Sequence, residues 1–130
     1  MFERGVLLVS ALIWLPYGVY CFLEPDSLAE AAGVVASTPT ATTELRAMYG
    51  GLQMAIGALA ASALWKPRLV SGALLTLVFL TGGLAATRVL GVLLDGGFSS
   101  YTVGGLVFEV LTVILGLVAL GRGQPGAART

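Results

Sequence analysis

Four long apolar segments, separated by short polar connections, make up most of this 130-residue chain. They cover about residues 5–23, 44–65, 69–94 and 101–120. A helix needs about 20 predominantly apolar residues to cross the hydrocarbon core of a bilayer, and each segment is close to that length. The pattern therefore predicts an all-α fold, an integral membrane four-helix transmembrane bundle.

The second segment opens with an unusual group of polar residues, Glu44-Leu-Arg46-Ala-Met-Tyr49-Gly50-Gly51-Leu-Gln53. Successive residues of a helix are rotated by about 100°, so Arg46, Tyr49 and Gln53 share a face that we expect to look into protein. We expect a second face to look into lipid: Leu45, Met48, Leu52, Ile56 and Leu59. A third face has small residues that would let a neighbouring helix approach closely: Ala47, Gly51, Ala55, Ala58 and Ser62.

The composition supports an integral membrane protein. Hydrophobic residues make up 57% of the chain and charged residues 11%, against roughly 45–50% and about 25% in soluble domains. Four spans with their connections use up the length, so we predict a single membrane domain over residues 1–130. The formal net charge is zero, so no basic field is present to attract nucleic acid.

The chain has no histidine and a single cysteine, Cys21. These counts argue against bis-histidine haem, di-iron and zinc sites, Ser-His-Asp and Cys-His nucleophiles, and a Cys-x-x-Cys relay. We therefore predict no cofactor and no metal. Any catalysis would rest on carboxylates, arginines and tyrosines.

The longest connection, residues 24–43, is acidic at first and then rich in Ser, Thr and Pro. We predict a short interfacial helix over Ser27–Ala32, a loop over residues 37–43, and a helix start at Thr43. This connection would fold over the outer mouth of the bundle. The chain then ends in a polar tail over residues 121–130.

Charges in the connections predict the orientation. In a four-span arrangement five basic residues lie on one side: Arg4, Lys66, Arg68, Arg122 and Arg129. The opposite side carries only acidic ones: Glu24, Asp26, Glu30 and Asp95. Because cytoplasmic loops are enriched in Lys and Arg, we predict that both termini are cytoplasmic.

Four charged residues fall in the outer half of the predicted membrane region: Glu44, Arg46, Arg88 and Glu109. Each charge facing lipid costs roughly 2.5–3.5 kcal/mol on the insertion scale, so we expect the two carboxylates and two guanidiniums to pair. The third and fourth spans run antiparallel and bring Arg88 and Glu109 to a similar depth, given a rise of about 1.5 Å per residue. The spacing therefore predicts an Arg88–Glu109 ion pair.

This charged cluster has three interpretations. It is a packing device that fixes helix register, in a structural or accessory subunit of a membrane complex. Alternatively it belongs to a site for a small amphiphile, lipid or anion, in which Arg46 and Arg88 bind an anionic head group and four further residues line the pocket: Trp14, Tyr17, Tyr49 and Gln53. In the third interpretation Glu109 is the general acid/base of a membrane-embedded enzyme. The small-residue faces also permit a homo-oligomer or a membrane partner protein.

The motif Glu44-x-Arg46-x-x-Tyr49-Gly50-Gly51, with Arg88, the Asp95-Gly96 turn and Glu109, resembles a known family. This is the uncharacterised bacterial family of membrane proteins catalogued as domain of unknown function 4345, which is similar to the DoxX-like four-helix membrane proteins. The resemblance covers nearly the whole chain and implies a multi-pass protein of the bacterial inner (plasma) membrane, in contact with membrane lipid. It supplies no activity. DoxX-like proteins are associated with sulfur and quinone redox chemistry, but this chain has no cysteine pair for thiol chemistry.

Overall fold

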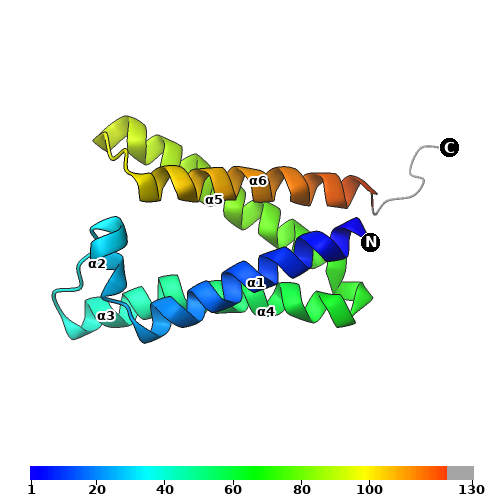
Figure 1. The fold of residues 1–130 in the computed structure, drawn as a ribbon, viewed down its shortest axis with the longest axis horizontal. Helices are drawn as coiled ribbons and strands as arrows, with labels where there is room; N and C mark the ends of the chain where they lie inside the picture. The colour runs from blue at the N-terminus through cyan, green and yellow to red at the C-terminus, as the bar shows by residue number, and fades with distance from the viewer. Residues whose placement is uncertain (123–130) are drawn as a thin grey trace.

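A computed structural model describes residues 1–122, which are almost entirely helical and include no strand. Four helical segments are long and apolar enough to cross a membrane, so the predicted all-α four-helix membrane fold is confirmed. Most of the predicted tail, with Arg129, lies outside the described residues. The elements in chain order are α1 (Phe2–Leu23), α2 (Ser27–Ala32), α3 (Pro39–Leu45), the π-helical turn η1 (Arg46–Gly51), α4 (Leu52–Trp65), the 3₁₀ turn η2 (Pro67–Leu69), α5 (Val70–Asp95) and α6 (Ser100–Arg122) (Figure 1).

The helical part of the second span starts earlier than predicted. Ser27–Ala32 is a helix, as expected, but the loop over residues 37–43 and the start at Thr43 are wrong. The helix begins at Pro39, after Thr38, whose side-chain oxygen accepts a hydrogen bond from the Ala41 amide at 3.1 Å. Threonine at the N-cap and proline at the first helical position are both favourable, so this Thr/Pro segment starts a helix.

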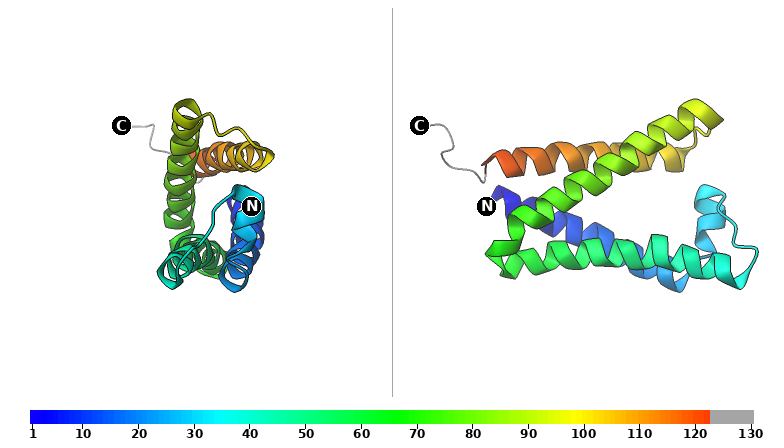
Figure 2. Two further views of the ribbon diagram at one scale, coloured as in Figure 1. Left: turned by 90° about the vertical axis from the view of Figure 1, so that its left-hand side faces the viewer. Right: turned by 180° about the vertical axis from the view of Figure 1, so that it is seen from behind.

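The long helices form two pairs, α1 with η1 and α4, and α5 with α6. The pairs meet at the end of the molecule that holds the N terminus and the α4–α5 turn, and α5 diverges from α4 toward the end where α2 lies (Figures 1 and 2). A compact core joins the pairs where they meet, and its side chains are at most 1% exposed: Leu7, Ala60, Ala63, Ala73, Leu74, Leu77 and Ala119. Packing is therefore tight at one end of the bundle.

Close approach of α1 to the second span depends on three glycines. A Cβ atom added at Gly57 would lie 2.6 Å from the Leu15 amide nitrogen, and one at Gly50 would lie 2.9 Å from the Phe22 Cα. Gly18 is equally crowded, 2.5 Å from the Met54 amide nitrogen. The predicted small-residue face is not the contact surface, since Ala47, Ala55 and Ala58 are exposed.

The π-helical turn η1 changes which residues of the second span face the protein. Because a π-helical turn contains one residue more than an α-helical turn, residues before η1 are rotated by about 100° relative to those after it. Leu45 is consequently buried, and Arg46, at the start of η1, is exposed. The predicted lipid-facing surface is thus wrong for Leu45 and for Ile56, which is 5% exposed, and right for Met48 and Leu52.

Four basic residues lie at the end of the molecule that holds the N terminus: Arg4, Lys66, Arg68 and Arg122. The guanidinium carbon of Arg122 lies 4.7 Å from the centre of the Phe2 ring, which joins the end of α6 to the start of α1. The α4–α5 turn, with Lys66 and Arg68, is at the same end (Figure 1). The orientation of these ends in a membrane remains a prediction.

Cysteine labelling in spheroplasts tests that orientation. We expect an impermeant maleimide to label Asp26→Cys and Asp95→Cys from outside, and Arg68→Cys only after permeabilisation, because Lys and Arg favour the cytoplasmic side. The wild type provides the baseline, since its one cysteine, Cys21, is 1% exposed. Labelling of Arg68→Cys in intact spheroplasts would contradict the predicted topology.

Candidate functional site

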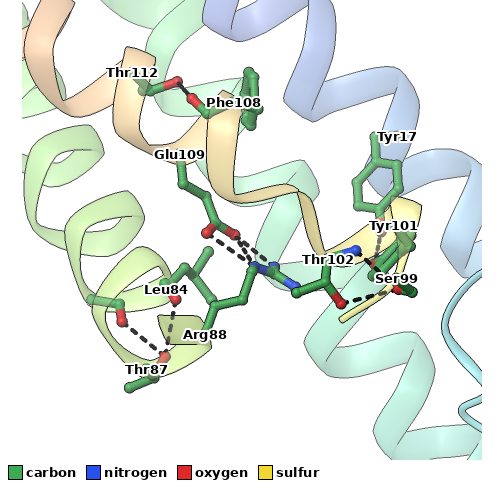
Figure 3. Close-up of polar contacts among 11 residues, drawn as sticks. Tyr17, Leu84, Thr87, Arg88, Ser99, Tyr101, Thr102, Phe108, Glu109 and Thr112 are labelled. Carbon is green, nitrogen blue, oxygen red and sulfur yellow. Dashed lines mark hydrogen bonds and ion pairs between the residues drawn. The ribbon is translucent and has the colours of Figure 1, made fainter. Parts of the chain in front are cut away.

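An ion pair joins the second pair of helices within the apolar bundle. Arg88 on α5 donates from Nη2 to Glu109 Oε1 on α6 at 2.6 Å, and from Nε to both carboxylate oxygens at 3.1–3.2 Å (Figure 3). Glu109 is 2% exposed, and the Arg88 side chain is 25% exposed. The predicted Arg88–Glu109 pair is therefore present, with the planar two-nitrogen contact that makes Arg a good partner for a buried carboxylate.

Helix α6 also shapes the space that the guanidinium occupies. A Cβ atom added at Gly105 would lie 3.1 Å from the Arg88 Cζ, so a side chain at this position would press on the arginine. The ring of Tyr101 lies on the same helix, with its centre 5.9 Å from that carbon, within range of a cation–π interaction. Helix α6 thus supplies the carboxylate and the aromatic ring near Arg88, and its Gly105 leaves the space for the guanidinium.

A cavity of about 920 Å³ lies beside the ion pair, between the two helix pairs. Residues of α1, η1, α4, α5 and α6 line it. Six of the eight predicted site residues belong to the lining: Trp14, Tyr17, Tyr49, Gln53, Arg88 and Glu109. The structure therefore brings together side chains that are far apart in the sequence.

Glu44 and Arg46 lie elsewhere. Both are exposed, neither lines the cavity, and neither forms an ion pair within residues 1–122. The guanidinium carbon of Arg46 lies 5.7 Å from the centre of the Phe22 ring. The predicted four-charge network and the role of Arg46 in it are thus wrong, because η1 turns Arg46 away from the face that carries Gln53.

Two buried polar atoms in the cavity wall have no hydrogen-bond partner in the described part of the chain, Trp14 Nε1 and Gln53 Oε1. Their residues are 4% and 8% exposed. A buried polar group without a partner costs roughly 1–3 kcal/mol. Both atoms are fully enclosed by protein, so they lie behind the surface of the cavity and not on it.

Tyr17 and Tyr101 close the cavity toward α2. Their hydroxyl groups are 3.1 Å apart and form a hydrogen bond between α1 and α6 (Figure 3). Both tyrosines also line a smaller cavity of about 340 Å³ under α2, together with Cys21 and Leu28. The tyrosine pair therefore stands between the two cavities.

Sequence reasoning did not assign Tyr101 to the site. Tyr101, Gly105 and Glu109 are spaced four residues apart, which places them along one helix face, and this spacing was the available signal. Phe108, whose ring centre is 5.5 Å from that of Trp14, was missed because an apolar residue in an apolar span carries no signal of its own. Within residues 1–122, no three His, Cys, Asp or Glu side chains gather closely enough to hold a metal ion.

A family model described as Domain of unknown function (DUF4345) matches residues 2–120. This chain belongs to the DUF4345 family. Comparison with curated proteins and with solved structures found no match. Family membership carries no activity, so any function of this DUF4345 protein has to be argued from the cavity and its ion pair.

The ion pair predicts an asymmetric response to mutation in the DUF4345 protein. Arg88→Leu strands a buried carboxylate and should cost about 3–5 kcal/mol of stability, whereas Glu109→Gln keeps the shape and some hydrogen bonding and should cost less. Arg88→Leu combined with Glu109→Leu should recover much of the loss, since an apolar pair needs no partner. The measurement is thermal stability in detergent. Losses that add in the double variant would contradict a coupled pair.

Proposed function

We propose that this DUF4345 protein binds a membrane amphiphile in the cavity between its two helix pairs. The observation that carries the proposal is the cavity itself, about 920 Å³ in volume. Pockets for small molecules commonly measure about 300–1,000 Å³. The cavity is thus large enough for the head group and part of the chain of a lipid-like molecule.

The cavity has a polar part and an apolar part, as an amphiphile requires. Toward α2 its wall contains Tyr17, Tyr49, Arg88 and Tyr101. Farther from α2 the lining is mostly apolar, although Gln53 and Glu109 also belong to it; its apolar members are Ile13, Ile56, Phe79, Leu80 and Phe108. This order supports a ligand with its head group toward the outer half of the membrane and its chain directed inward.

The cavity reaches the surface of the bundle between the second span and α5. Met48 and Leu52 on one side, and Leu80 and Leu84 on the other, line the cavity and are themselves 37–55% exposed. Apolar side chains at this position would face hydrocarbon. An amphiphile could therefore enter from the bilayer without crossing water.

The other interpretations explain less of the structure. A packing role accounts for the Arg88–Glu109 pair, but not for a cavity of about 920 Å³ beside it. An acid/base role is not needed to explain Glu109, because both of its oxygens accept hydrogen bonds from Arg88. The proposed setting is the bacterial inner membrane, with membrane lipid as the partner.

Fluorescence of Trp14 tests the proposal, because Trp14 lines the cavity and the chain has only one other tryptophan, Trp65. In a Trp65→Phe background, a fatty acid methyl ester with bromine atoms in mid-chain should quench Trp14 saturably. Adding Gly104→Leu should weaken the affinity for the ester, measured by that quenching, about tenfold or more. This loss is equivalent to about 1.4 kcal/mol of binding free energy. A Cβ at Gly104 meets nothing within 4 Å, and the residue lines the cavity, so the new side chain has room there and would narrow the cavity.

Gly72→Leu is the matched control. Gly72 lies in α5, is exposed, has equal space around it and does not line the cavity. Its substitution should leave quenching unchanged. Quenching that never saturates, or that Gly104→Leu and Gly72→Leu affect equally, would contradict binding in the cavity.

A further inference from the structure

The charges in the cavity wall sum to zero. Within residues 1–122, Arg88 and Glu109 are the only charged residues in the lining, and they neutralise each other at 2.6 Å. Arg46, which would have added a positive charge, is exposed on η1 and outside the lining. The wall therefore offers a strong local dipole without a net charge.

A neutral wall disfavours an ionic head group. An ion taken out of water loses several kcal/mol of solvation free energy even after the protein relaxes. An ion pair whose charges cancel each other offsets little of this loss. The attraction of a carboxylate or phosphate to Arg88 would be offset by repulsion from Glu109, and the attraction of an ammonium group to Glu109 would be offset by repulsion from Arg88. An uncharged head group loses much less solvation on entering.

The ion pair leaves a hydrogen-bond donor unused at the cavity. Arg has five N–H groups, and only Nε and Nη2 of Arg88 donate to Glu109. Nη1 of Arg88 donates no hydrogen bond within residues 1–122, and this nitrogen is a donor only. The unpartnered Trp14 Nε1 and Gln53 Oε1 are fully enclosed by protein and do not contribute to this surface. Glu109, the strongest acceptor in the lining, already accepts from Arg88 with both oxygens.

We infer that the cavity is selective for an amphiphile whose head group is uncharged and accepts hydrogen bonds, such as an ester, a ketone or a tertiary amide. The acceptor oxygen would lie toward Arg88 Nη1, and the apolar chain would lie along Ile56, Phe79 and Phe108. This inference rests on the proposed function and adds the chemical class of the ligand. It replaces the anionic head group expected from the sequence.

Three probes with the same brominated chain test the selectivity: a methyl ester, a carboxylate and a primary ammonium. They are titrated into the Trp65→Phe protein at a pH where the acid is ionised and the amine protonated. Affinity is taken from the saturable part of the Trp14 quenching that Gly104→Leu weakens, and the Gly104→Leu titration of each probe corrects for different partitioning into micelles. The ester should bind at least about tenfold more tightly than either charged probe.

Glu109→Gln supplies a second test, because it leaves the positive charge of Arg88 uncompensated beside the cavity. This change should shift the preference from the ester toward the carboxylate by about tenfold. Asp95→Asn, which removes a carboxylate outside the lining, should leave the ester preference unchanged. If Glu109→Gln does not fold, the comparison of the three probes on the wild-type cavity still tests the head-group assignment.

The outcomes separate the two proposals. Equal binding of the three probes, or a preference for a charged probe in the wild-type cavity, would overturn the head-group assignment and leave amphiphile binding intact. An unchanged ester preference in folded Glu109→Gln would also overturn it, since charge balance would then not set the selectivity. Saturable quenching by none of the probes would overturn amphiphile binding, and the head-group assignment with it.

Discussion

A charge inside a lipid-embedded bundle has to be matched by another group of the bundle, and this constraint fixes the α5–α6 half of the structure. Glu109 is 2% exposed, so without Arg88 it would be an unpaired anion in a medium of low dielectric constant. The pair holds two antiparallel helices at one register, and the bare backbone at Gly105 leaves room for the guanidinium. The other half depends on a different device, the close contact of α1 with the second span at Gly18, Gly50 and Gly57.

Each half of the bundle is well packed, but the space between the two halves is packed at one end only. They share a tight apolar core near the N terminus, but α5 diverges from α4 toward α2, and the cavity lies in that region. The ion pair needs no cavity, and a bundle selected only for packing would fill the space with side chains. The size of the cavity and its exposed apolar lining between the second span and α5 together favour a ligand. The pair would then serve twice, by joining two helices and by presenting donors to that ligand.

Much of this arrangement could be predicted from the sequence. The four apolar segments of spanning length predict the number of membrane helices. The similar depth of Arg88 and Glu109 in antiparallel spans predicts their ion pair. Threonine and proline, as at Thr38 and Pro39, are typical of loops, but the same residue types also start helices. Arg46 was misplaced because spacing arguments assume 3.6 residues per turn throughout, and the π-helical turn at residues 46–51 breaks that assumption. The cavity depends on how far α5 diverges from α4, which no residue pattern encodes locally.

The central claim is that the wild-type protein carries a lipid-like molecule in this cavity, and native mass spectrometry of protein purified gently from membranes tests it directly. The account predicts a population with one bound molecule of an uncharged lipid class, retained in Gly72→Leu and lost in Gly104→Leu. Bare protein in every sample, or the same bound lipid in the Gly104→Leu variant, would contradict it.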